Sequence, residues 1–248
     1  MYLKGAENSV MILWLIATFS AYFVKGLCGF ANGLIFTTIL GFGASNTSIS
    51  PVNLLLGYPA NLILTWKTRR NLDRKVWLPL SILVLAGSIP GALLLKSVDE
   101  RTTKLVFGIV IIALGTEMLV REFCQKRARS SKLVLAVIGV TGGMLCGLYG
   151  VGALLAAYVS RVTKNDGSFK ANISAVFVVD NTFRIILYKT LGLLTLRTIK
   201  TFLLLIPFAL IGLLTGMKCS ESMNENKIRR ITTVFLILSG ISLVLKNL

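Results

Sequence analysis

The stretch Lys25-Gly-Leu-Cys-Gly-Phe-Ala-Asn-Gly33 interrupts an apolar run that extends from Val10 to Phe42. The run is longer than the ~20 residues that one straight helix needs to cross a bilayer core. The stretch contains three glycines, and each glycine costs a helix ~1 kcal/mol relative to alanine. Irregular backbone at membrane depth is tolerated only beside protein or a water-filled cavity. The sequence therefore predicts a broken helix next to a polar cavity.

A break of this kind can bind an anion, because it exposes unpaired backbone N–H groups and the positive end of a helix dipole. We interpret the stretch as one half of a binding site for a small anion. A second glycine-rich stretch, Gly142-Gly-Met-Leu-Cys-Gly-Leu-Tyr-Gly-Val-Gly152, has the composition to form the other half.

The two glycine-rich stretches belong to a pattern that recurs along the chain. Four short matches appear twice in the same order with slowly growing spacing, as expected for a duplicated unit with small loop insertions. They are Cys28-Gly29 and Cys146-Gly147, Trp66-Lys-Thr68 and Tyr188-Lys-Thr190, Gly87-x-x-x-Gly91 and Gly212-x-x-x-Gly216, and Gly115 and Gly240. Internal repeats are common among transporters. We predict a first repeat over residues 1–125 and a second over residues 126–248, within one membrane domain.

The composition is that of an all-α, polytopic membrane protein. Hydrophobic residues make up 54% of the chain and charged residues 15%, and several apolar stretches approach the length of a membrane span. We expect about eight transmembrane helices, four in each homologous repeat, with a glycine-broken helix opening each repeat. The spacing of Gly87 and Gly91 predicts close packing against a neighbouring helix.

Basic residues exceed acidic residues by 27 to 10, and most lie in short loops between the expected spans. This placement is typical of the positive-inside pattern and of contact with anionic lipid, so the charge does not indicate nucleic-acid binding. Counting one crossing for each span predicts that both termini lie on the cytoplasmic side of the cell membrane, with the basic loops 67–75 and 121–132. Loops 158–170 and 218–230 are then expected on the opposite side. The two repeats are parallel in this topology, which fails if a glycine break forms a re-entrant hairpin.

Few ionisable residues fall inside the expected spans, where a charge costs ~2.5–3.5 kcal/mol. Lys25 lies beside the first break, where it either attracts anions or snorkels to the interface. Asp180 and Arg184 are four residues apart and share a helix face, which Tyr188 extends. They form either a structural ion pair or an arrangement in which Asp180 supports Arg184 as an oxyanion ligand.

The candidate substrate-binding residues combine the two breaks with polar residues of the spans, including amides that need hydrogen-bond partners. They are Lys25, Gly26, Gly29, Asn32, Gly33, Asn61, Gly147, Tyr149, Gly150, Gly152, Asn181 and Arg184, with Asp180 as the supporting ion-pair partner. Cys28 and Cys146 are either small residues beside glycines or contacts for a sulfur-containing substrate.

No familiar catalytic motif accompanies these residues. The chain has no histidine and four cysteines without a zinc-binding spacing, and we identify no catalytic triad or phosphate-binding loop. We therefore expect neither a cofactor nor a metal. A membrane-embedded enzyme is the least favoured class, because Asp180 is the only carboxylate firmly within a span.

The residues around both breaks resemble those of the sulfite exporter TauE/SafE family of integral membrane permeases. Family members typically open each half with a glycine-rich segment. Gly26-Leu-Cys-Gly-Phe-Ala-Asn-Gly33 is similar to the first segment, and Gly147-Leu-Tyr-Gly-Val-Gly152, followed by Tyr158, is similar to the second. The run Phe169-Lys-Ala171, with Asn181, Arg184 and Tyr188, resembles the second half of one branch. The chain departs from that branch at Ala153-Leu-Leu155, where Gly-Pro-Pro is frequent, and at Asn32, where glycine is frequent.

The resemblance implies a permease for sulfite, sulfonates or related small organic anions. The broken helices favour alternating access, with the substrate gradient, a partner protein or a coupled ion such as H+ or Na+ as the driving force. The expected partners are the anionic substrate and membrane lipid. The main alternative is a non-transporting membrane scaffold or assembly factor.

Overall fold

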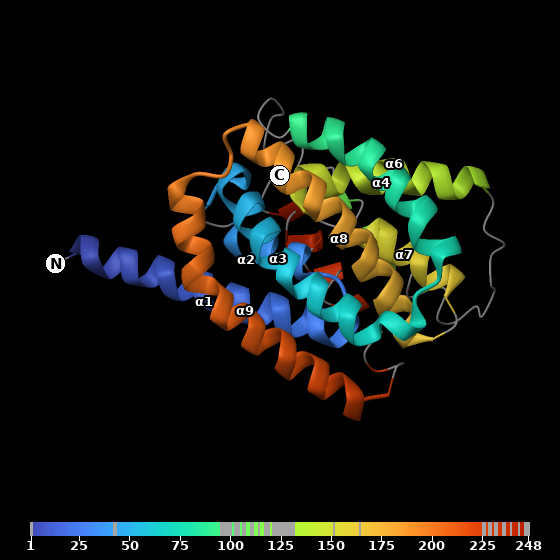
Figure 1. The fold of residues 1–248 in the computed structure, drawn as a ribbon. Coiled ribbons are helices and arrows are strands. Elements are labelled where there is room, and N and C mark those ends of the chain that lie inside the picture. Colours follow the sequence, from blue (N-terminus) through green and yellow to red (C-terminus); the bar gives the residue numbers. More distant parts are fainter. Residues whose placement is uncertain are drawn as a thin grey trace.

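The computed structural model describes residues 2–41, 44–94, 132–150, 152–163 and 165–224, with short pieces between 101 and 120 and between 227 and 245. Every regular element in this part is a helix (Figure 1), so the prediction of an all-α protein is confirmed for these residues. The elements are α1 (Tyr2–Cys28), α2 (Asn32–Leu40), α3 (Asn46–Thr68), the 3-10 helix η1 (Arg69–Asn71), α4 (Arg74–Leu94), α6 (Lys132–Tyr149), α7 (Ala153–Val162), α8 (Asp166–Thr190) and α9 (Leu196–Ser222). The expected spans 105–119 and 231–245 lie largely outside the described residues.

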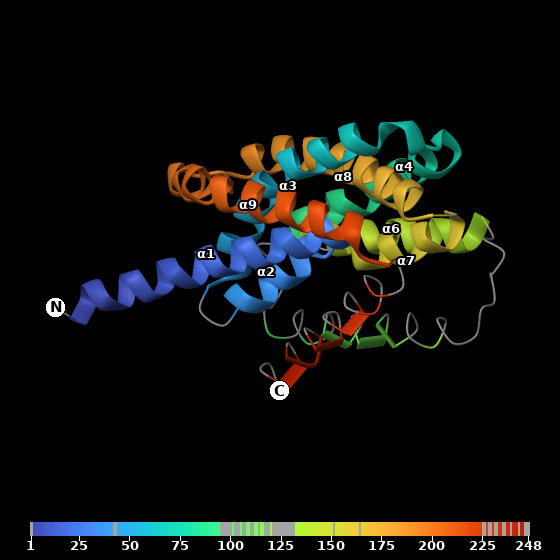
Figure 2. The same cartoon turned by 90° about the horizontal axis from the view of Figure 1, so that it is seen from below.

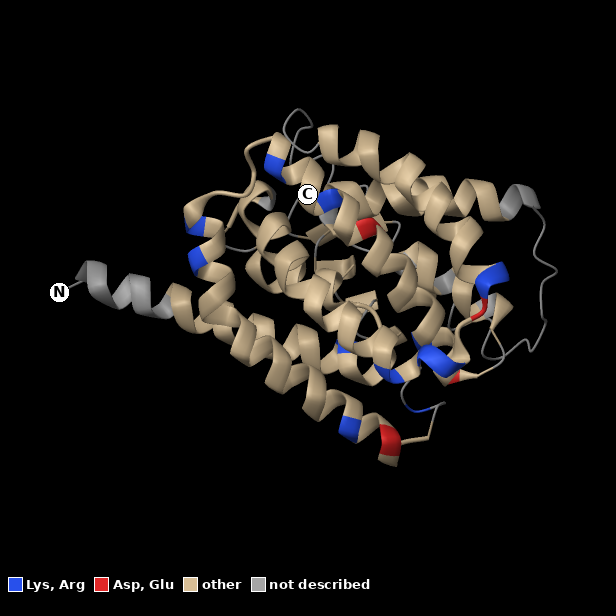
Figure 3. Cartoon of the chain, in the orientation of Figure 1, with Lys and Arg blue, Asp and Glu red and all other residues tan. Residues whose placement is uncertain are grey.

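Three of the described helices are long and apolar enough to cross a membrane: Val10–Cys28 of α1, Arg74–Leu94 of α4 and Leu196–Ser222 of α9. Their outer faces carry exposed large apolar side chains such as Ile82 and Leu203. A water-soluble protein rarely leaves such a surface uncovered, whereas lipid covers it in a bilayer. The charged segments in Figure 3 lie mainly toward the ends of the helices.

The chain reverses direction between α1 and α2, and Figure 2 shows α2 alongside the second part of α1. The rings of Trp14 and Phe36 meet edge to face with their centroids 5.8 Å apart, although 22 residues separate them, so α2 runs back along α1. A second reversal joins α6 to α7, because a Cβ atom on Gly142 would lie 2.6 Å from a methyl carbon of Leu155. Both glycine-rich stretches therefore form the tips of helical hairpins rather than kinks in continuous spans.

This reversal changes the predicted topology. Lys67, at the end of α3, forms a 2.8 Å ion pair with Glu221, at the end of α9. The backbone N–H of Asp73, just before α4, donates to Asn172 near the start of α8 over 3.0 Å. The segments 67–75, 165–172 and 218–222 thus lie together at what we call the basic end. The prediction that loops 67–75 and 218–230 lie on opposite sides is wrong, because it counted each hairpin as one crossing.

Two crossing helix pairs hold the bundle together. The most extensive helix contacts among the described residues are those of α4 with α6 and of α1 with α9. A Cβ atom on Gly87 would collide with the carbonyl oxygen of Val140, and one on Gly216 with that of Phe23. The predicted close packing at Gly87 is therefore confirmed, since only a residue without a side chain allows such an approach.

The two halves of the chain run in opposite directions. α3 ends at the basic end, where α8 begins, and α4 begins there, where α9 ends. The two strongest pairs each join the first helix of one half to the last described long helix of the other. The predicted parallel arrangement of the halves is therefore wrong for the part of the chain that the structure describes.

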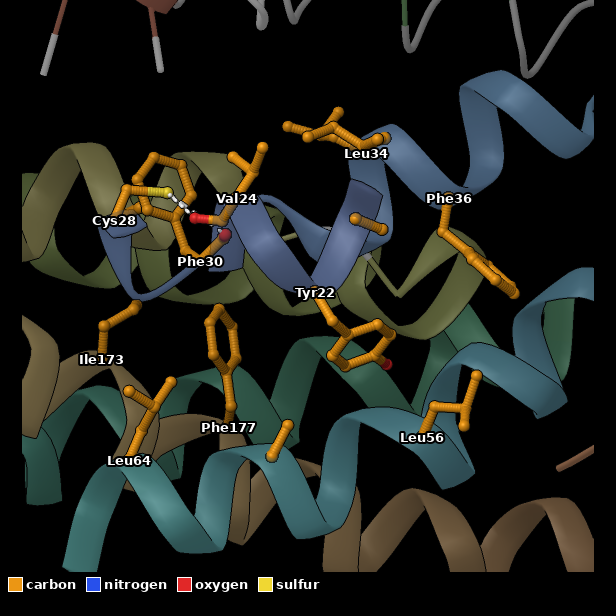
Figure 4. Close-up of a cluster of buried hydrophobic side chains, with 14 of the residues drawn as sticks. Tyr22, Val24, Cys28, Phe30, Leu34, Phe36, Leu56, Leu64, Ile173 and Phe177 are labelled. Carbon is orange, nitrogen blue, oxygen red and sulfur yellow. Dashed lines mark hydrogen bonds between the residues drawn. The ribbon is translucent and has the colours of Figure 1, made fainter. Parts of the chain in front are cut away.

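An apolar core lies between the first hairpin and helices α3 and α8. Figure 4 shows Tyr22 reaching from α1 toward α3, with Leu56 and Phe177 among the side chains beneath the hairpin. Tyr22 and Leu56 are fully buried. This packing surrounds the polar residues of α3 and α8 and holds them opposite the hairpin tips.

Candidate functional site

A polar cavity lies where the two hairpin tips meet. Its walls come from α1, α2, α3, α6 and α8 and from the glycines between α6 and α7. Nine residues of the predicted site line it: Lys25, Asn32, Gly33, Asn61, Gly150, Gly152, Asp180, Asn181 and Arg184. Two stretches more than a hundred residues apart thus contribute to one cavity.

The first tip is a short left-handed turn. α1 ends at Cys28, Gly29 has φ 84° and Ala31 has φ 72°. A residue other than glycine in this region costs ~1–3 kcal/mol and is held there by its surroundings. α2 then begins at Asn32, so its first turn faces the cavity.

The second tip begins with the same turn but continues differently, because Gly152, at the position that corresponds to Ala31, has φ −109°. Gly150 has φ 69°, and its N–H donates to the carbonyl of Cys146, just as the N–H of Gly29 donates to that of Lys25. Gly29 therefore corresponds to Gly150, and Lys25 to Cys146. The match of Cys28 with Cys146 predicted from the sequence is displaced by about one helical turn.

The two tips touch. A Cβ atom on Gly33 would collide with the carbonyl oxygen of Gly150. Only glycine can occupy position 33 without moving this carbonyl. The contact brings the start of α2 next to the irregular backbone before α7, and the cavity lies beside it.

The helices that begin at the tips lack side-chain caps. Asn165 caps α8 by accepting from Ser168 N–H, and Thr195 caps α9 by accepting from Thr198 N–H. No side chain caps α2 at Ala31. Gly152, before α7, has no side chain that could do so. Uncapped N–H groups are available to an anion, which the helix dipole also attracts.

Lys25 is buried and belongs to the cavity. Its side chain is 1% exposed, and Nζ donates to Oδ1 of Asn32 over 2.9 Å. The ammonium group also lies 5.4 Å from the centroid of the Phe177 ring. No carboxylate among the described residues forms an ion pair with it. The alternative in which Lys25 snorkels to the interface is therefore wrong, and its amino group lies at the wall of the cavity.

A chain of amides and a phenol extends from Lys25 to α3. Asn32 Nδ2 donates to Oδ1 of Asn53 over 3.1 Å, and a longer contact of 3.4 Å joins it to the hydroxyl of Tyr22. Asn53 lies on α3, one and two turns before Gly57 and Asn61. These contacts hold the first hairpin tip against α3 and orient the amide that accepts from Lys25.

Arg184 approaches the second tip and is held from two sides. Its Nη2 donates to the hydroxyl of Tyr188 over 3.0 Å, and its Nη1 lies 3.5 Å from Oδ2 of Asp180. The predicted ion pair is thus present but long. Tyr188 in turn donates to the carbonyl of Gly147 over 2.9 Å and lies 3.0 Å from Oγ of Ser50. The guanidinium group is therefore fixed against α6 while it faces the cavity.

The cavity has more basic than acidic side chains, together with unpaired polar atoms. Its ionisable lysine, arginine and aspartate side chains are Lys25, Arg184 and Asp180, so two bases face the cavity with one carboxylate. Nε of Arg184 and Oδ1 of Asn61 are buried without a hydrogen-bond partner. Buried polar groups normally have partners. A small anion with oxygen acceptors can supply the partner that Nε lacks.

Three other predicted residues pack helices together instead of lining the cavity. Gly26 lies against α9 at Leu213, Gly29 against the side chain of Lys170, and Gly147 against α4 at Ser88. The side chain of Tyr149 lies outside the described residues. These glycines shape the tips without reaching the cavity.

Several cavity residues were missed from the sequence, including Asn53, Gly57 and Phe177. The four-residue spacing of Asn53, Gly57 and Asn61 is a detectable signal, because it puts three small or polar residues on one helix face. Phe177 has no such signal. Cys146 lines the cavity, whereas the thiol of Cys28 bonds to the carbonyl of Val24 over 3.0 Å.

The described residues contain no group of three or more side chains that could hold a metal ion. A family model described as "Sulfite exporter TauE/SafE" matches residues 14–243, which is nearly the whole chain and includes both hairpins and α8. Comparison with curated proteins and with solved structures gives no match.

Proposed function

The chain belongs to the sulfite exporter TauE/SafE family of membrane transporters, and from this premise we propose that it moves a small anion across the cell membrane by alternating access. The cavity at the meeting hairpin tips carries the proposal, because it combines two buried bases with a single carboxylate. A charge buried at membrane depth is costly and usually functional. The substrate class we infer is sulfite, a sulfonate or another small organic anion.

In this proposal, different side chains of the cavity have different roles in binding the anion. Arg184 offers its unpaired Nε to one oxygen of the anion while Tyr188 holds the rest of the guanidinium group. Lys25, held by Asn32, adds charge from the first tip. The uncapped starts of α2 and α7 add backbone N–H donors, and the amides of Asn61 and Asn181 orient the ligand.

We propose that the two halves are inverted copies of one unit, with boundaries near residues 1–125 and 126–248. Three observations support this. The hairpin tips share their turn geometry at Gly29 and Gly150, corresponding helices run in opposite directions, and glycines mediate the α1–α9 and α4–α6 crossings alike. In such inverted repeats the substrate site lies near the midplane, and access alternates by exchange between the two related conformations.

A transport assay with purified protein tests the function. Proteoliposomes loaded with labelled sulfite, sulfonates and short carboxylates are expected to release at least one of them faster than protein-free vesicles. Arg184→Gln should slow that flux about 10- to 100-fold, since a hydrogen bond to a charged group contributes roughly 1.5–3 kcal/mol.

The matched control is Arg197→Gln, which removes an exposed arginine at the start of α9 and should retain the wild-type flux. Equal fluxes with and without protein for the whole panel would refute transport of these anions and leave the scaffold alternative. Equal slowing by both variants would refute the role of Arg184.

We infer that the basic end faces the cytoplasm. Six exposed bases lie there, namely Lys67, Arg69, Arg70, Arg74, Lys75 and Lys218. Three bases lie at the opposite end, where α8 ends and α9 begins, namely Lys189, Arg197 and Lys200. Cytoplasmic loops carry the excess of Lys and Arg. α1 runs parallel to α9, which ends at the basic end, so α1 starts at the other end. This orientation places the beginning of α1 outside the cytoplasm, contrary to the orientation expected from the sequence.

Epitope tags test the orientation. A tag before Val10 should be reached by an impermeant antibody on intact cells, or on spheroplasts if an outer layer covers the membrane. A tag between Arg70 and Leu72 should be reached only after the membrane is made permeable. The reverse pattern would show that the basic end faces outward.

A further inference from the structure

Asp180 is a buried carboxylate whose charge depends on one neighbour. Its side chain is 1% exposed and lines the cavity. Among the described residues, Oδ1 has no hydrogen bond of good geometry and Oδ2 forms one ion pair, with Nη1 of Arg184 at 3.5 Å. The hydroxyl of Ser88 on α4 is the other donor close to the carboxylate. Ordinary buried carboxylates accept several hydrogen bonds or a close bidentate arginine. Asp180 has neither, so Arg184 is the only positive charge among the described residues that pairs with its ionised form.

The other groups that face Asp180 do not replace this partner. Cys146 approaches from α6 and Ser88 from α4, and neither carries a positive charge. On α8 itself the hydroxyl of Tyr188 donates to Gly147. Lys25 is bound to Asn32 on the first tip. The described parts of α3 and α7 present no charged residue to the cavity.

An anion bound at Arg184 therefore competes with Asp180. Both are acceptors for the same guanidinium group, and two negative charges that share a buried site raise the free energy of each ionised form. Removing one partner of a buried ion pair leaves a charge whose desolvation is uncompensated. Taking up a proton removes that charge without moving the backbone.

Resting on the proposed function, we propose that Asp180 is a proton-binding site and that the chain carries one proton with each anion. As the anion binds to Arg184, a proton from water binds to a carboxylate oxygen of Asp180. Anion and proton then leave on the other side, and Asp180 pairs with Arg184 again. For a monovalent anion the transported charge is zero, so a pH difference drives transport and a membrane voltage does not.

The binding reaction tests this first, because it needs no variant. In weakly buffered detergent solution with a pH-sensitive dye, adding the transported anion to the wild-type protein should take up close to one proton for each anion bound. Binding without proton uptake would overturn the inference while leaving the proposed function intact. If no anion of the panel binds or moves, both fail together.

Accumulation of the anion in proteoliposomes under a pH gradient is the second test. An outside one pH unit more acidic than the lumen should drive roughly tenfold accumulation of the anion at equal starting concentrations, since one unit equals a tenfold ratio. Asp180→Asn should bind anion without proton uptake and should not accumulate it under this gradient. Asp73→Asn, which changes an exposed aspartate outside the cavity, should accumulate anion as the wild type does. Accumulation by Asp180→Asn at the wild-type level would refute the role of Asp180.

Discussion

The two hairpin tips begin with the same backbone turn but differ in side chains. Gly29 and Gly150 both adopt positive φ and both donate to the carbonyl four residues earlier. Before the first glycine stands Lys25, hydrogen-bonded to Asn32. The corresponding position of the second tip is Cys146, and the positive charge there comes from Arg184 on α8. The tips can thus keep the shape of an inverted pair while charge is distributed unequally, which gives the cavity two different cationic contacts.

We expect the largest effect on transport from a substitution where the two tips touch. Gly33→Val would force its side chain into the Gly150 carbonyl, so transport should fall more than 100-fold and thermal stability should fall too. Flux and thermal unfolding in detergent measure these effects. Ala86→Val is the control, because it adds a valine at an exposed position of α4 that does not line the cavity. A valine variant with wild-type flux would show that the tip contact is dispensable.

Removing the positive charge of Arg184 at the second tip is expected to have the next largest effect. Arg184→Gln should lower the free energy of unfolding by about 3–5 kcal/mol, because it leaves Asp180 buried without a counter-ion. Adding Asp180→Asn should restore most of that stability and none of the anion binding. Denaturation curves and anion binding separate the two effects. If the double variant were no more stable than the single one, the long ion pair would not be the cause.

Replacing Lys25 by cysteine, the residue at the corresponding position of the second tip, tests what Lys25 contributes to anion binding. Lys25→Cys gives the first tip the side chain of the second, and it should weaken anion binding about tenfold, for a loss of roughly 1.4 kcal/mol. The hairpin should persist because its glycines remain. Lys75→Cys, at an exposed lysine of the basic end, is the control. Unchanged affinity in Lys25→Cys would mean that Arg184 alone supplies the charge.

We expect the smallest effect from removing the hydroxyl of Tyr188, which holds Arg184 in place. Tyr188→Phe removes the hydroxyl that holds Arg184 and leaves the Gly147 carbonyl without its donor. At about 1 kcal/mol for one neutral hydrogen bond, we expect affinity to fall about fivefold. Tyr58→Phe, which removes a partly exposed hydroxyl near Thr182, should change affinity less. Equal effects of the two variants would contradict a positioning role for Tyr188.

The features that local spacing controls were predictable from the sequence. The four-residue interval between Asp180 and Arg184 predicts a shared helix face, and the pair is present. The interval between Gly87 and Gly91 predicts a close helix crossing, and it is found with α6. In both cases helix periodicity is enough to specify the neighbour.

The direction of the chain after each break was not predictable in the same way. It depends on the left-handed turn at Ala31 and on contacts such as Trp14 with Phe36, which no local pattern encodes. The miscounted crossings moved whole loops to the wrong side. Asn53 was missed for a related reason, because its role appears only when the first tip folds onto α3.

The crossing of α1 with α9 has a consequence for how the protein is made. α1 leaves the ribosome long before α9, because almost 200 residues separate Phe19 and Phe23 from Gly212 and Gly216, against which they pack. Contacts so distant along a chain form slowly. The first hairpin must therefore wait in the bilayer without its main partner, and nascent chains released before α9 would expose this face to quality-control proteases.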